Sequence, residues 1–488
     1  MSAALPVNLR VSDAATGKPT PVRLRIVDDQ GNFYVPLGRS SDFPLGRNEQ
    51  VGVCVYLGGR KFVFFDGSCE IILPADVPLH LEISKGPEYR PIRETVTLKP
   101  GKMALRFTIE RWTDTRAEGW KRADTRCHFL SPHDALLEAA AENLDLVYLL
   151  ATEHDSPSND GHLYRVTPNL TAFSGQQPIV ERDGHAVVVN TFNTHPALGR
   201  LGLLHSHRPV FPLSFGSTDQ TDDWSLLDWC NQCHRKAGLA VWCDAFRQEK
   251  GLNGGEALIA AILGKLDVLE FDGGERSQPL LPFWYRLLNA GVRLPIVGGS
   301  GKESNRQVLG SMRTYTLMEP GADTLGDWVE QTRRGRTFVT NGPLLDFKVN
   351  GHVAGTTLSM STVAVQARAR CLTPFERFEI VMNGEVVAEA TPSGESAVIE
   401  QSITLPEGGW LAARCLGTAS LFAHTSPVWV EMEGRPRRVD PAAVKTIGKM
   451  LDTVKDWIET NGNFTLPKRR EQMLQGCLEA LAVIERHV

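Results

Sequence analysis

The sequence predicts a mixed α/β protein in which a distorted α/β barrel lies between two small β-sandwiches and a helical tail follows. Three observations predict this fold class. Residues 1–112 and 346–434 alternate apolar and polar positions between turn residues, as half-buried strands do. Residues 113–345 repeat a helix followed by a short, nearly continuous apolar strand, as parallel sheets require. Residues 435–488 place apolar side chains at helical spacing.

Length and composition restrict the class of protein. A chain of 488 residues is too long for one ordinary core, and 42% hydrophobic with 22% charged residues is typical of a soluble globular protein. A net charge of −5 gives no support for nucleic-acid binding. We expect no membrane span, because no apolar run approaches roughly 20 residues. Scattered cysteines and no visible signal peptide indicate a cytoplasmic protein, or a secreted or periplasmic one if a leader was trimmed.

The first 112 residues are expected to form the amino-terminal sandwich. The runs 7–11 and 22–27 alternate in polarity, and residues 61–65 and 79–83 continue the pattern. Asp66-Gly67 predicts a hairpin. No catalytic combination of side chains occurs in this segment, which favours a packing or carbohydrate-side module.

The barrel segment begins with a strong helix signal. Ser131-Pro132 followed by Asp134 predicts an N-cap, a proline at N1 and an acidic capping residue ahead of an apolar helix over 135–141. The strand 144–151 follows and ends in Thr152-Glu153-His154-Asp155. The same order returns three times, with a last helix over 323–336; the predicted helices span 223–236, 256–263 and 281–289, and the strands 239–243, 266–269 and 293–297.

Polar residues follow these strands, and the carboxyl ends of barrel strands are where clefts form. Asp244, Glu270, Asp272 and the segment 298–303 all come at predicted strand ends. We therefore expect Asp124, His128, His154, Asp244 and Glu270 to line one cleft.

The carboxyl-terminal parts are predicted from turn and cap signals. Asn383-Gly384 indicates a hairpin in the second sandwich. Asp440-Pro441 indicates a helix start, a break at 461–463 follows, and a second amphipathic run covers 473–483. The tail is therefore expected to be a helical hairpin packed on the body.

The stretch Asp124-Thr125-Arg126-Cys127-His128 carries the main chemical signal. A His-x-His at a strand end puts two imidazoles on one face, where they share a metal ion. Here the first of those positions is Arg126, a permanent cation that ligates no metal.

On these motifs the chain resembles the CehA/McbA group of metallohydrolases in the polymerase-and-histidinol-phosphatase (PHP) superfamily, over most of its length. The resemblance implies a PHP-like barrel and a hydrolytic site with two or three metals. The motifs that carry the likeness are Asp-Thr-Arg-Cys-His at 124–128, Ala-Thr-Glu-His-Asp at 151–155, Val-Trp-Cys-Asp at 241–244, Gly-Gly-Ser-Gly-Lys-Glu at 298–303, and the closing segment 335–343.

The departures from the family fall on its metal ligands. Asp124, His128 and His154 match, and Glu153 keeps a carboxylate. The other ligand positions have changed: Arg126 and Asp244 replace histidines, Gly301 replaces an aspartate, and Phe192 and Arg200 stand where relatives carry a glutamate and a histidine. Since glycine and phenylalanine offer no ligand atom and arginine adds positive charge, these losses predict a degenerate site.

Two interpretations of the surviving residues stay open. In the first, the carboxylates form salt bridges with Arg126 and Arg200, no cofactor binds, and the protein binds or scaffolds an unknown small molecule or protein. Arg126 would then lie within ion-pair reach of at least one of Glu153, Asp155, Asp244, Glu270 and Asp272. In the second, one Zn or Mn ion activates water for hydrolysis of an ester, phosphoester or amide. Its residual ligands would be Asp124, His128, Glu153, His154 and Asp244, in a cleft lined by Arg126, Arg200, Glu270, Asp272 and Lys302.

Three further motifs have competing interpretations. Cys230–His234 matches the CxxCH of c-type haem attachment, but it lies in a predicted helix without an export signal, which favours a structural origin over haem or redox chemistry. His205-Ser206-His207 is either a relocated ligand pair or a solvent-facing loop. Residues 298–302 are glycine-rich after a strand but lack Walker spacing, which makes them a weak phosphate signal.

Overall fold

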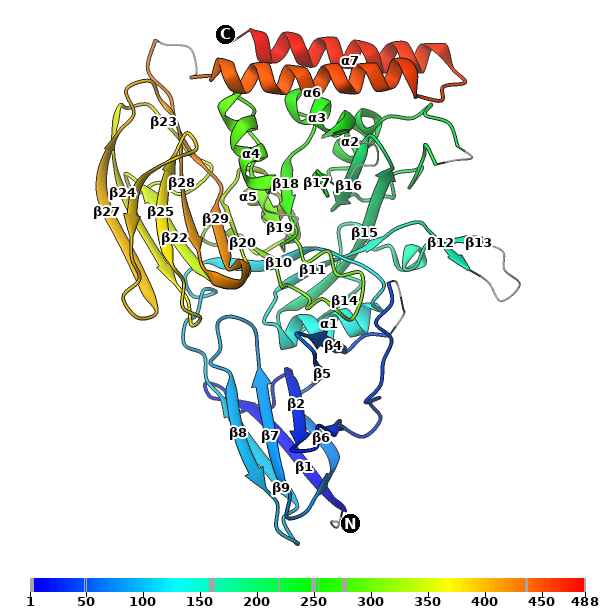
Figure 1. The fold of residues 1–488 in the computed structure, drawn as a ribbon, viewed down its shortest axis with the longest axis vertical. Helices are drawn as coiled ribbons and strands as arrows, with labels where there is room; N and C mark the ends of the chain where they lie inside the picture. Colours follow the sequence, from blue (N-terminus) through cyan, green and yellow to red (C-terminus); the bar gives the residue numbers. More distant parts are fainter. Residues whose placement is uncertain are drawn as a thin grey trace. The chain divides into compact units, whose positions relative to one another are not determined.

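The computed structural model describes residues 4–47, 49, 51–157, 163–217, 220–246, 252, 254–273, 279–434 and 438–486 (Figure 1). The chain is a mixed α/β protein that divides into two compact units. Unit 1 contains Met1–Leu149, Pro178–Val189 and Ser300–Ser311, and unit 2 contains Leu150–Gln177, Asn190–Gly299 and Met312–Val488. No helix in the described parts of the chain is long and apolar enough to cross a membrane.

Unit 1 begins with two β-sheets that share one core, drawn in blue in Figure 1. One sheet has the order β6-β1-β9 and the other β4-β5-β2-β7-β8, with β3 paired to β2. Alternate residues such as Leu9 and Leu24 point into the shared core, so this part is sandwich-like, as the alternation predicted. The strands are β1 (Ala4–Asp13), β2 (Val22–Asp28), β3 (Phe33–Tyr34), β4 (Cys54–Leu57), β5 (Arg60–Phe65), β6 (Ser68–Pro74), β7 (Pro78–Ser84), β8 (Ile92–Thr97) and β9 (Ala104–Ile109).

The predicted hairpin at Asp66-Gly67 is wrong. β5 and β6 flank this dipeptide, but β5 pairs with β2 and β4 while β6 pairs with β1 in the other sheet. Gly67 has a φ of +93°, and a Cβ there would lie 2.4 Å from the backbone nitrogen of Thr20. The glycine therefore allows two backbones to approach closely where the chain changes sheets.

The helix α1 (Pro132–Ala141) explains why β5 is apolar on both faces. Val63 and Phe65 face the sandwich core, whereas Phe62 and Phe64 pack with Ala141 of α1. α1 begins as predicted, because Ser131 Oγ accepts a hydrogen bond from the Asp134 amide at 3.1 Å. The helix connects two parallel strands, β10 (Trp120–Cys127) and β11 (Leu146–Ala151), and a hairpin joins β14 (Val180–Arg182) to β15 (His185–His195).

The second half of β15 and strands β16 to β19 form a run in unit 2 that is only partly parallel. Its order is β19-β18-β17-β16-β15, and β17, β18 and β19 are parallel, but β16 is antiparallel to both of its neighbours. Three residues, 196–198, join β15 to β16, which is too short for the helical crossover that parallel strands need. The helix-then-strand repeat is thus interrupted; the strands are β16 (Gly199–Leu204), β17 (Leu239–Cys243), β18 (Val268–Phe271) and β19 (Ile296–Gly298).

Three helices cover one face of this run, and their side chains share a core with alternate strand residues such as Trp242, Leu269 and Ile296. Their bounds are close to those predicted: α2 (Leu226–Arg235), α3 (Gly255–Ile262) and α4 (Leu280–Asn289). A short hairpin of β12 (His154–Pro157) and β13 (Leu163–Val166), which the sequence did not predict, also belongs to unit 2.

The β-rich end of unit 2 has a run of strands of order β20-β21-β29-β28-β25-β26, which belongs to a 16-stranded sheet, and a separate sheet of order β22-β24-β27; β30 pairs with β28 and β23. The hairpin predicted at Asn383-Gly384 is confirmed, since both residues have positive φ and join two paired strands. The elements are β20 (Arg313–Leu317), α5 (Leu325–Arg333), β21 (Thr337–Thr340), β22 (Leu344–Val349), β23 (Thr357–Leu358), β24 (Thr362–Arg370), β25 (Arg377–Met382), β26 (Glu385–Ala390), β27 (Ser396–Thr404), β28 (Gly409–Leu416), β29 (Phe422–Thr425) and β30 (Val428–Val430).

The predicted helical tail is confirmed. α6 (Pro441–Thr460) and α7 (Pro467–Glu485) lie side by side in Figure 1, in orange and red, and pack on α3 and α4. Asp440 caps α6 by accepting from the Ala442 amide at 2.9 Å, with Pro441 at N1. The buried side chains of α6 are mostly the apolar positions read from the sequence: Val444, Ile447, Leu451, Val454 and Ile458.

Glu256, in the first turn of α3, should make the stability of the fold depend on pH. The side chain is fully buried; its Oε2 accepts from the Leu226 amide at 2.8 Å, and its Oε1 has no partner among the described residues. Burial raises the pKa of Glu256 to about 7. An unfolded glutamate titrates near pH 4.3, so the folded state holds this proton more tightly and loses stability as the pH rises from about 4 to about 7.

We expect Glu256→Gln to raise the free energy of unfolding by about 2–4 kcal/mol at pH 8 and by little at pH 4.5. Urea denaturation of both proteins across this range is the measurement. Glu479→Gln, at an exposed position of α7, is the matched control and should follow the wild type. If the free energies of unfolding of wild type and Glu256→Gln differed by the same amount at every pH, the raised pKa of Glu256 would be contradicted.

Candidate functional site

Asp124, a predicted metal ligand in β10, accepts hydrogen bonds from backbone amides of unit 1. Its carboxylate is fully buried and accepts from the amides of Arg126 at 3.0 Å, Ser300 at 2.9 Å and Gly310 at 2.7 Å. Burial raises the pKa of Asp124 although these hydrogen bonds favour the anion. Both oxygens therefore hold the segment 300–310 against β10.

The glycine-rich segment that follows β19 is not an open phosphate cradle. The four successive amides of residues 300–303 all donate hydrogen bonds within unit 1. Their acceptors are Asp124 Oδ1, the Arg126 carbonyl, Ser300 Oγ and Gln307 Oε1. An anion would have to displace these internal acceptors, so the weak phosphate signal of this segment has no structural support.

Arg126 and Gly301 fit each other sterically. The Arg126 side chain is 1% exposed, and a Cβ added to Gly301 would lie 2.9 Å from its Nη2 and 3.2 Å from its Cζ. Gly301 also has a φ of +59°, a conformation that residues with side chains rarely adopt. The guanidinium therefore lies in the space next to Gly301 that a side chain at that position would need.

Lys302 is buried and paired within unit 1. Its Nζ lies 3.1 Å from Glu138 Oε2 of α1 and donates to the Gln307 carbonyl at 2.8 Å. Both charged side chains are fully buried, and burial raises the pKa of Glu138 despite the nearby lysine. Glu138 was not predicted as a site residue, although it is the single acidic residue in the apolar run 135–141 and could have been noticed for that reason.

His128, which follows β10, is 3% exposed, and its amide donates to the Lys302 carbonyl at 2.9 Å.

In unit 2, Arg200 pairs with Asp244. Arg200 Nη1 lies 3.3 Å from Asp244 Oδ2, because β16 begins beside the end of β17 and Arg200 is in register with Cys243. The Asp244 side chain is 2% exposed, and the residue has a φ of +49°. This ion pair is one of those expected if internal salt bridges replace metal ions.

Glu153 and His154, which follow Thr152 after the end of β11, differ in their contacts. Ser214 Oγ donates to Glu153 Oε2, and Ser214 pairs with Thr194 of β15, so Glu153 lies near the end of that strand. The Nδ1 atom of His154 is buried and has no hydrogen-bond partner among the described residues. His154 therefore presents a ring nitrogen that the surrounding described residues leave unused.

Glu270 was predicted to follow its strand. The structure instead places Glu270 within β18. Leu269 and Phe271 face the helices, so Glu270 points to the opposite face of the strand run, where it is buried. Asp272 is the first residue after β18. The strand has the predicted length but is shifted by two residues toward the carboxyl terminus, because pairing with β19 continues through Phe271.

The predicted site residues are divided between the units. In unit 1 lie Asp124, Arg126, His128 and Lys302, and in unit 2 lie Glu153, His154, Arg200, Asp244, Glu270 and Asp272. Their assembly into one cleft, and ion pairs of Arg126 with unit 2 carboxylates, stay predictions. Among the described residues, no three His, Cys, Asp or Glu side chains form a group that could hold a metal ion.

Comparison with known proteins does not identify a family. The chain matches no protein-family model, and no curated protein is significantly similar to it. The resemblance to the PHP superfamily therefore rests on the motifs alone and stays a prediction.

The CxxCH sequence has a structural explanation. Cys230 and Cys233 are buried in α2, and burial raises the pKa of both thiols, that of Cys233 to about 12. His234 Nε2 lies 2.9 Å from Asp267 Oδ2. Redox-active thiols need a lowered pKa and exposure, and haem attachment needs accessible sulfur, so neither function is favoured here.

The His205-Ser206-His207 segment separates into two different environments. His207 is exposed, and its Nδ1 lies 3.0 Å from the Lys236 carbonyl at the end of α2. His205 is buried with a φ of +58°, and burial lowers its pKa. The two imidazoles are therefore not presented as a ligand pair.

Proposed function

We propose that this chain is a non-catalytic relative of the CehA/McbA-type metallohydrolases of the PHP superfamily, and that it binds or scaffolds a partner. The observation that carries the proposal is the buried Arg126 guanidinium beside Gly301. Arginine stays protonated in proteins, so it repels a metal ion at the position where the family carries a histidine ligand.

The other ligand positions support the same conclusion. Asp124 already accepts three backbone hydrogen bonds, and Asp244 is paired with Arg200. To bind a metal, each carboxylate would have to give up these partners, which leaves buried donors unsatisfied. The residues therefore do not fit a two- or three-metal site.

A single-metal hydrolase is the second candidate function. The Nδ1 of His154, which has no hydrogen-bond partner among the described residues, favours it, because imidazole nitrogen is a preferred ligand of zinc. In such an enzyme the metal would supply an activated water for hydrolysis of an ester, phosphoester or amide.

The test is to purify the full chain, measure its zinc and manganese content, and assay aryl phosphodiesters and aryl esters with either ion added. For the wild type we expect turnover no faster than the uncatalysed reaction. For Arg126→His we expect zinc affinity to rise at least tenfold while turnover stays at background. The new imidazole would lie two residues before His128 in the chain, but Arg200 and Gly301 would still leave a second metal without ligands.

Arg106→His, which adds a histidine at an exposed position of β9, is the matched control and should not change zinc affinity. Substantial metal-dependent hydrolysis by the wild type would refute the non-catalytic proposal and favour the single-metal enzyme. Strong hydrolysis by Arg126→His alone would show that the other ligand losses are wrongly assigned.

A further inference from the structure

Several asparagines in this chain are followed directly by glycine, at positions 253, 341, 350, 383 and 461. In such a pair the glycine nitrogen can attack the asparagine Cγ, because glycine has no side chain to block the approach. The reacting atoms must reach each other, so hydrogen bonds that hold the side chain elsewhere should slow the attack. Asn253 lies outside the described residues, and the structure allows the other four pairs to be compared.

Two of these asparagines are held by distant parts of the chain. Asn341 donates through Nδ2 to the Ser420 carbonyl at 2.7 Å and accepts at Oδ1 from the Phe422 amide at 2.8 Å. Asn350 accepts at Oδ1 from the Ala364 amide at 2.7 Å, and its own amide donates to the Ala364 carbonyl at 2.8 Å. In both residues the side-chain oxygen is fixed by a backbone donor that does not move with the asparagine.

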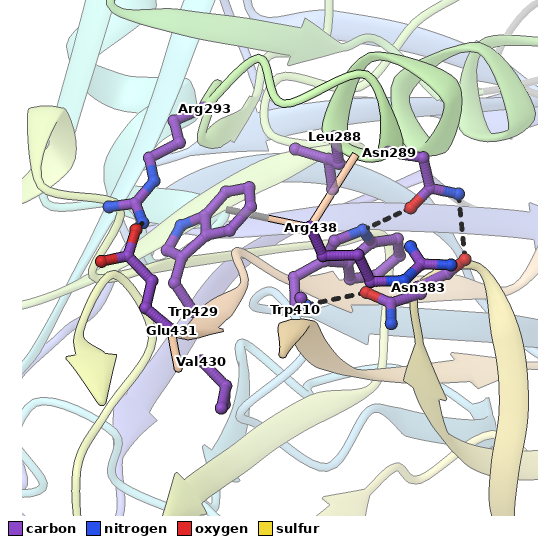
Figure 2. Close-up of a pocket in the computed structure, with 10 residues that line it drawn as sticks. Leu288, Asn289, Arg293, Asn383, Trp410, Trp429, Val430, Glu431 and Arg438 are labelled. Atoms are coloured by element: carbon purple, nitrogen blue, oxygen red, sulfur yellow. Dashed lines mark hydrogen bonds and ion pairs between the residues drawn. The ribbon is translucent and has the colours of Figure 1, made fainter. Parts of the chain in front are cut away.

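Asn383 is held in the same way, as Figure 2 shows. Its Oδ1 accepts from the Trp410 amide at 2.9 Å, and its Nδ2 donates to the Gly408 carbonyl at 3.4 Å. The Asn383 carbonyl also accepts from Asn289 Nδ2 at 2.9 Å. Both ends of the side chain and the main chain are therefore restrained.

Asn461 differs from the other three. It is exposed and ends α6, in the turn between the two helices of the tail (Figure 1). Its Oδ1 accepts only from the adjacent Thr460 Oγ1, at 2.8 Å, and its Nδ2 makes no hydrogen bond to any described residue. The Gly462 amide shares the Trp457 carbonyl with the Asn461 amide, at 3.0 and 2.8 Å. No distant group holds this side chain in place.

We propose that Asn461 is a site of spontaneous deamidation, with water as the co-reactant. The Gly462 nitrogen attacks Asn461 Cγ and forms a bond to it, the bond from Cγ to Nδ2 breaks, and ammonia leaves with the proton of the Gly462 amide. Water then opens the cyclic imide at either carbonyl, which leaves aspartate or isoaspartate. The site does not depend on the proposed function, since no predicted metal ligand takes part.

The modification would change how the tail turn contacts the body of unit 2. Asp222 Oδ2 accepts from the Asn463 amide at 2.6 Å. Asp223 Oδ1 accepts from the amides of Thr465 and Leu466, each at 3.0 Å. The new carboxylate would lie at the carbonyl end of α6, where the helix dipole disfavours an anion. Isoaspartate would also lengthen the main chain by one carbon just before these contacts, so we expect the turn to be held less tightly.

The experiment is to keep the full chain in mildly alkaline buffer and to follow each Asn-Gly peptide by mass spectrometry after digestion. In the folded protein, conversion at Asn461 should be at least tenfold faster than at Asn341, Asn350 or Asn383. In guanidinium chloride the four rates should agree within about threefold, because unfolding removes the hydrogen bonds that distinguish them. Similar rates at the four sites in the folded protein would overturn the proposal, and so would a tenfold excess at Asn461 that persists in the unfolded chain.

Two variants test the effect on the tail. Asn461→Gln moves the amide one carbon further from the Gly462 nitrogen and should leave this peptide unmodified. Asn461→Asp carries the charge of the product, and hydrogen exchange at the Asn463 and Thr465 amides should be at least threefold faster in it than in Asn461→Gln. Thr453→Asp, which adds the same charge at an exposed position within α6, is the matched control and should leave these exchange rates unchanged. Equal exchange in Asn461→Asp and Asn461→Gln would overturn the inferred loosening of the turn.

Discussion

Asp145→Ala is expected to lower the free energy of unfolding by about 3–5 kcal/mol, because it leaves a buried guanidinium without its main partner. Arg122, at the beginning of β10, is fully buried and donates to Asp145 through Nε at 2.8 Å and Nη2 at 2.7 Å. Its Nη1 also reaches Glu88 at 3.2 Å. This network lies at the opposite end of β10 from His128, so its role is to stabilise unit 1.

The effect of Asp145→Ala should depend on pH. Burial acts to raise the pKa of Asp145, but the hydrogen bonds and charge of Arg122 hold it at about 2, below the usual value near 3.9. The carboxylate therefore stabilises the fold fully above about pH 4, and this contribution is lost as the pH falls through about 2. Urea denaturation at pH 7 and at pH 3 should give a larger difference between wild type and variant at pH 7.

The control for Asp145→Ala is Asp42→Ala. Asp42 also pairs with a basic side chain, Lys61 at 3.2 Å, but its own side chain is 95% exposed. We expect a change of at most about 0.5 kcal/mol, because exposed ion pairs contribute little. A cost for Asp145→Ala as small as that of Asp42→Ala would show that the buried network is not a major source of stability.

Asp124→Asn is expected to lower the free energy of unfolding by about 2–4 kcal/mol without changing the metal content of the protein. An amide has one acceptor oxygen, so its NH2 group would face at least one of the backbone donors that Asp124 now satisfies. Hydrogen exchange at the Ser300 and Gly310 amides should become faster in the variant. Urea denaturation, exchange and elemental analysis together measure the effect.

The experiment on Asp124 separates a structural role from metal binding. Asp66→Asn, at an exposed position, is the control and should leave stability unchanged. If Asp124 ligates a metal, Asp124→Asn should release that metal. A fall in zinc or manganese content with unchanged stability in the metal-free protein would therefore contradict the role inferred from its three backbone partners.

Local signals in the sequence correctly predicted where two helices begin and where one hairpin turn lies. The cap at Ser131, the turn at Asn383-Gly384 and the start of α6 at Asp440-Pro441 appear where predicted. Each depends on residues that are close in the chain, so its physical cause is contained in a short segment. The periodicity of the tail and the apolar runs of β11 and β17 were predictable for the same reason.

The tertiary structure decided which strands pair and which groups the unusual side chains contact. Asp66-Gly67 has the composition of a hairpin, yet the chain changes sheets there because Gly67 packs against the backbone of Thr20. The sequence likewise identified Asp124, Arg126 and Gly301 as unusual positions, but not what they contact. The acceptors and donors around them are mostly backbone groups and side chains far away in the chain. Backbone amides carry no residue-specific signal, so only the packed fold shows that Asp124 is already saturated and that Gly301 makes room for Arg126.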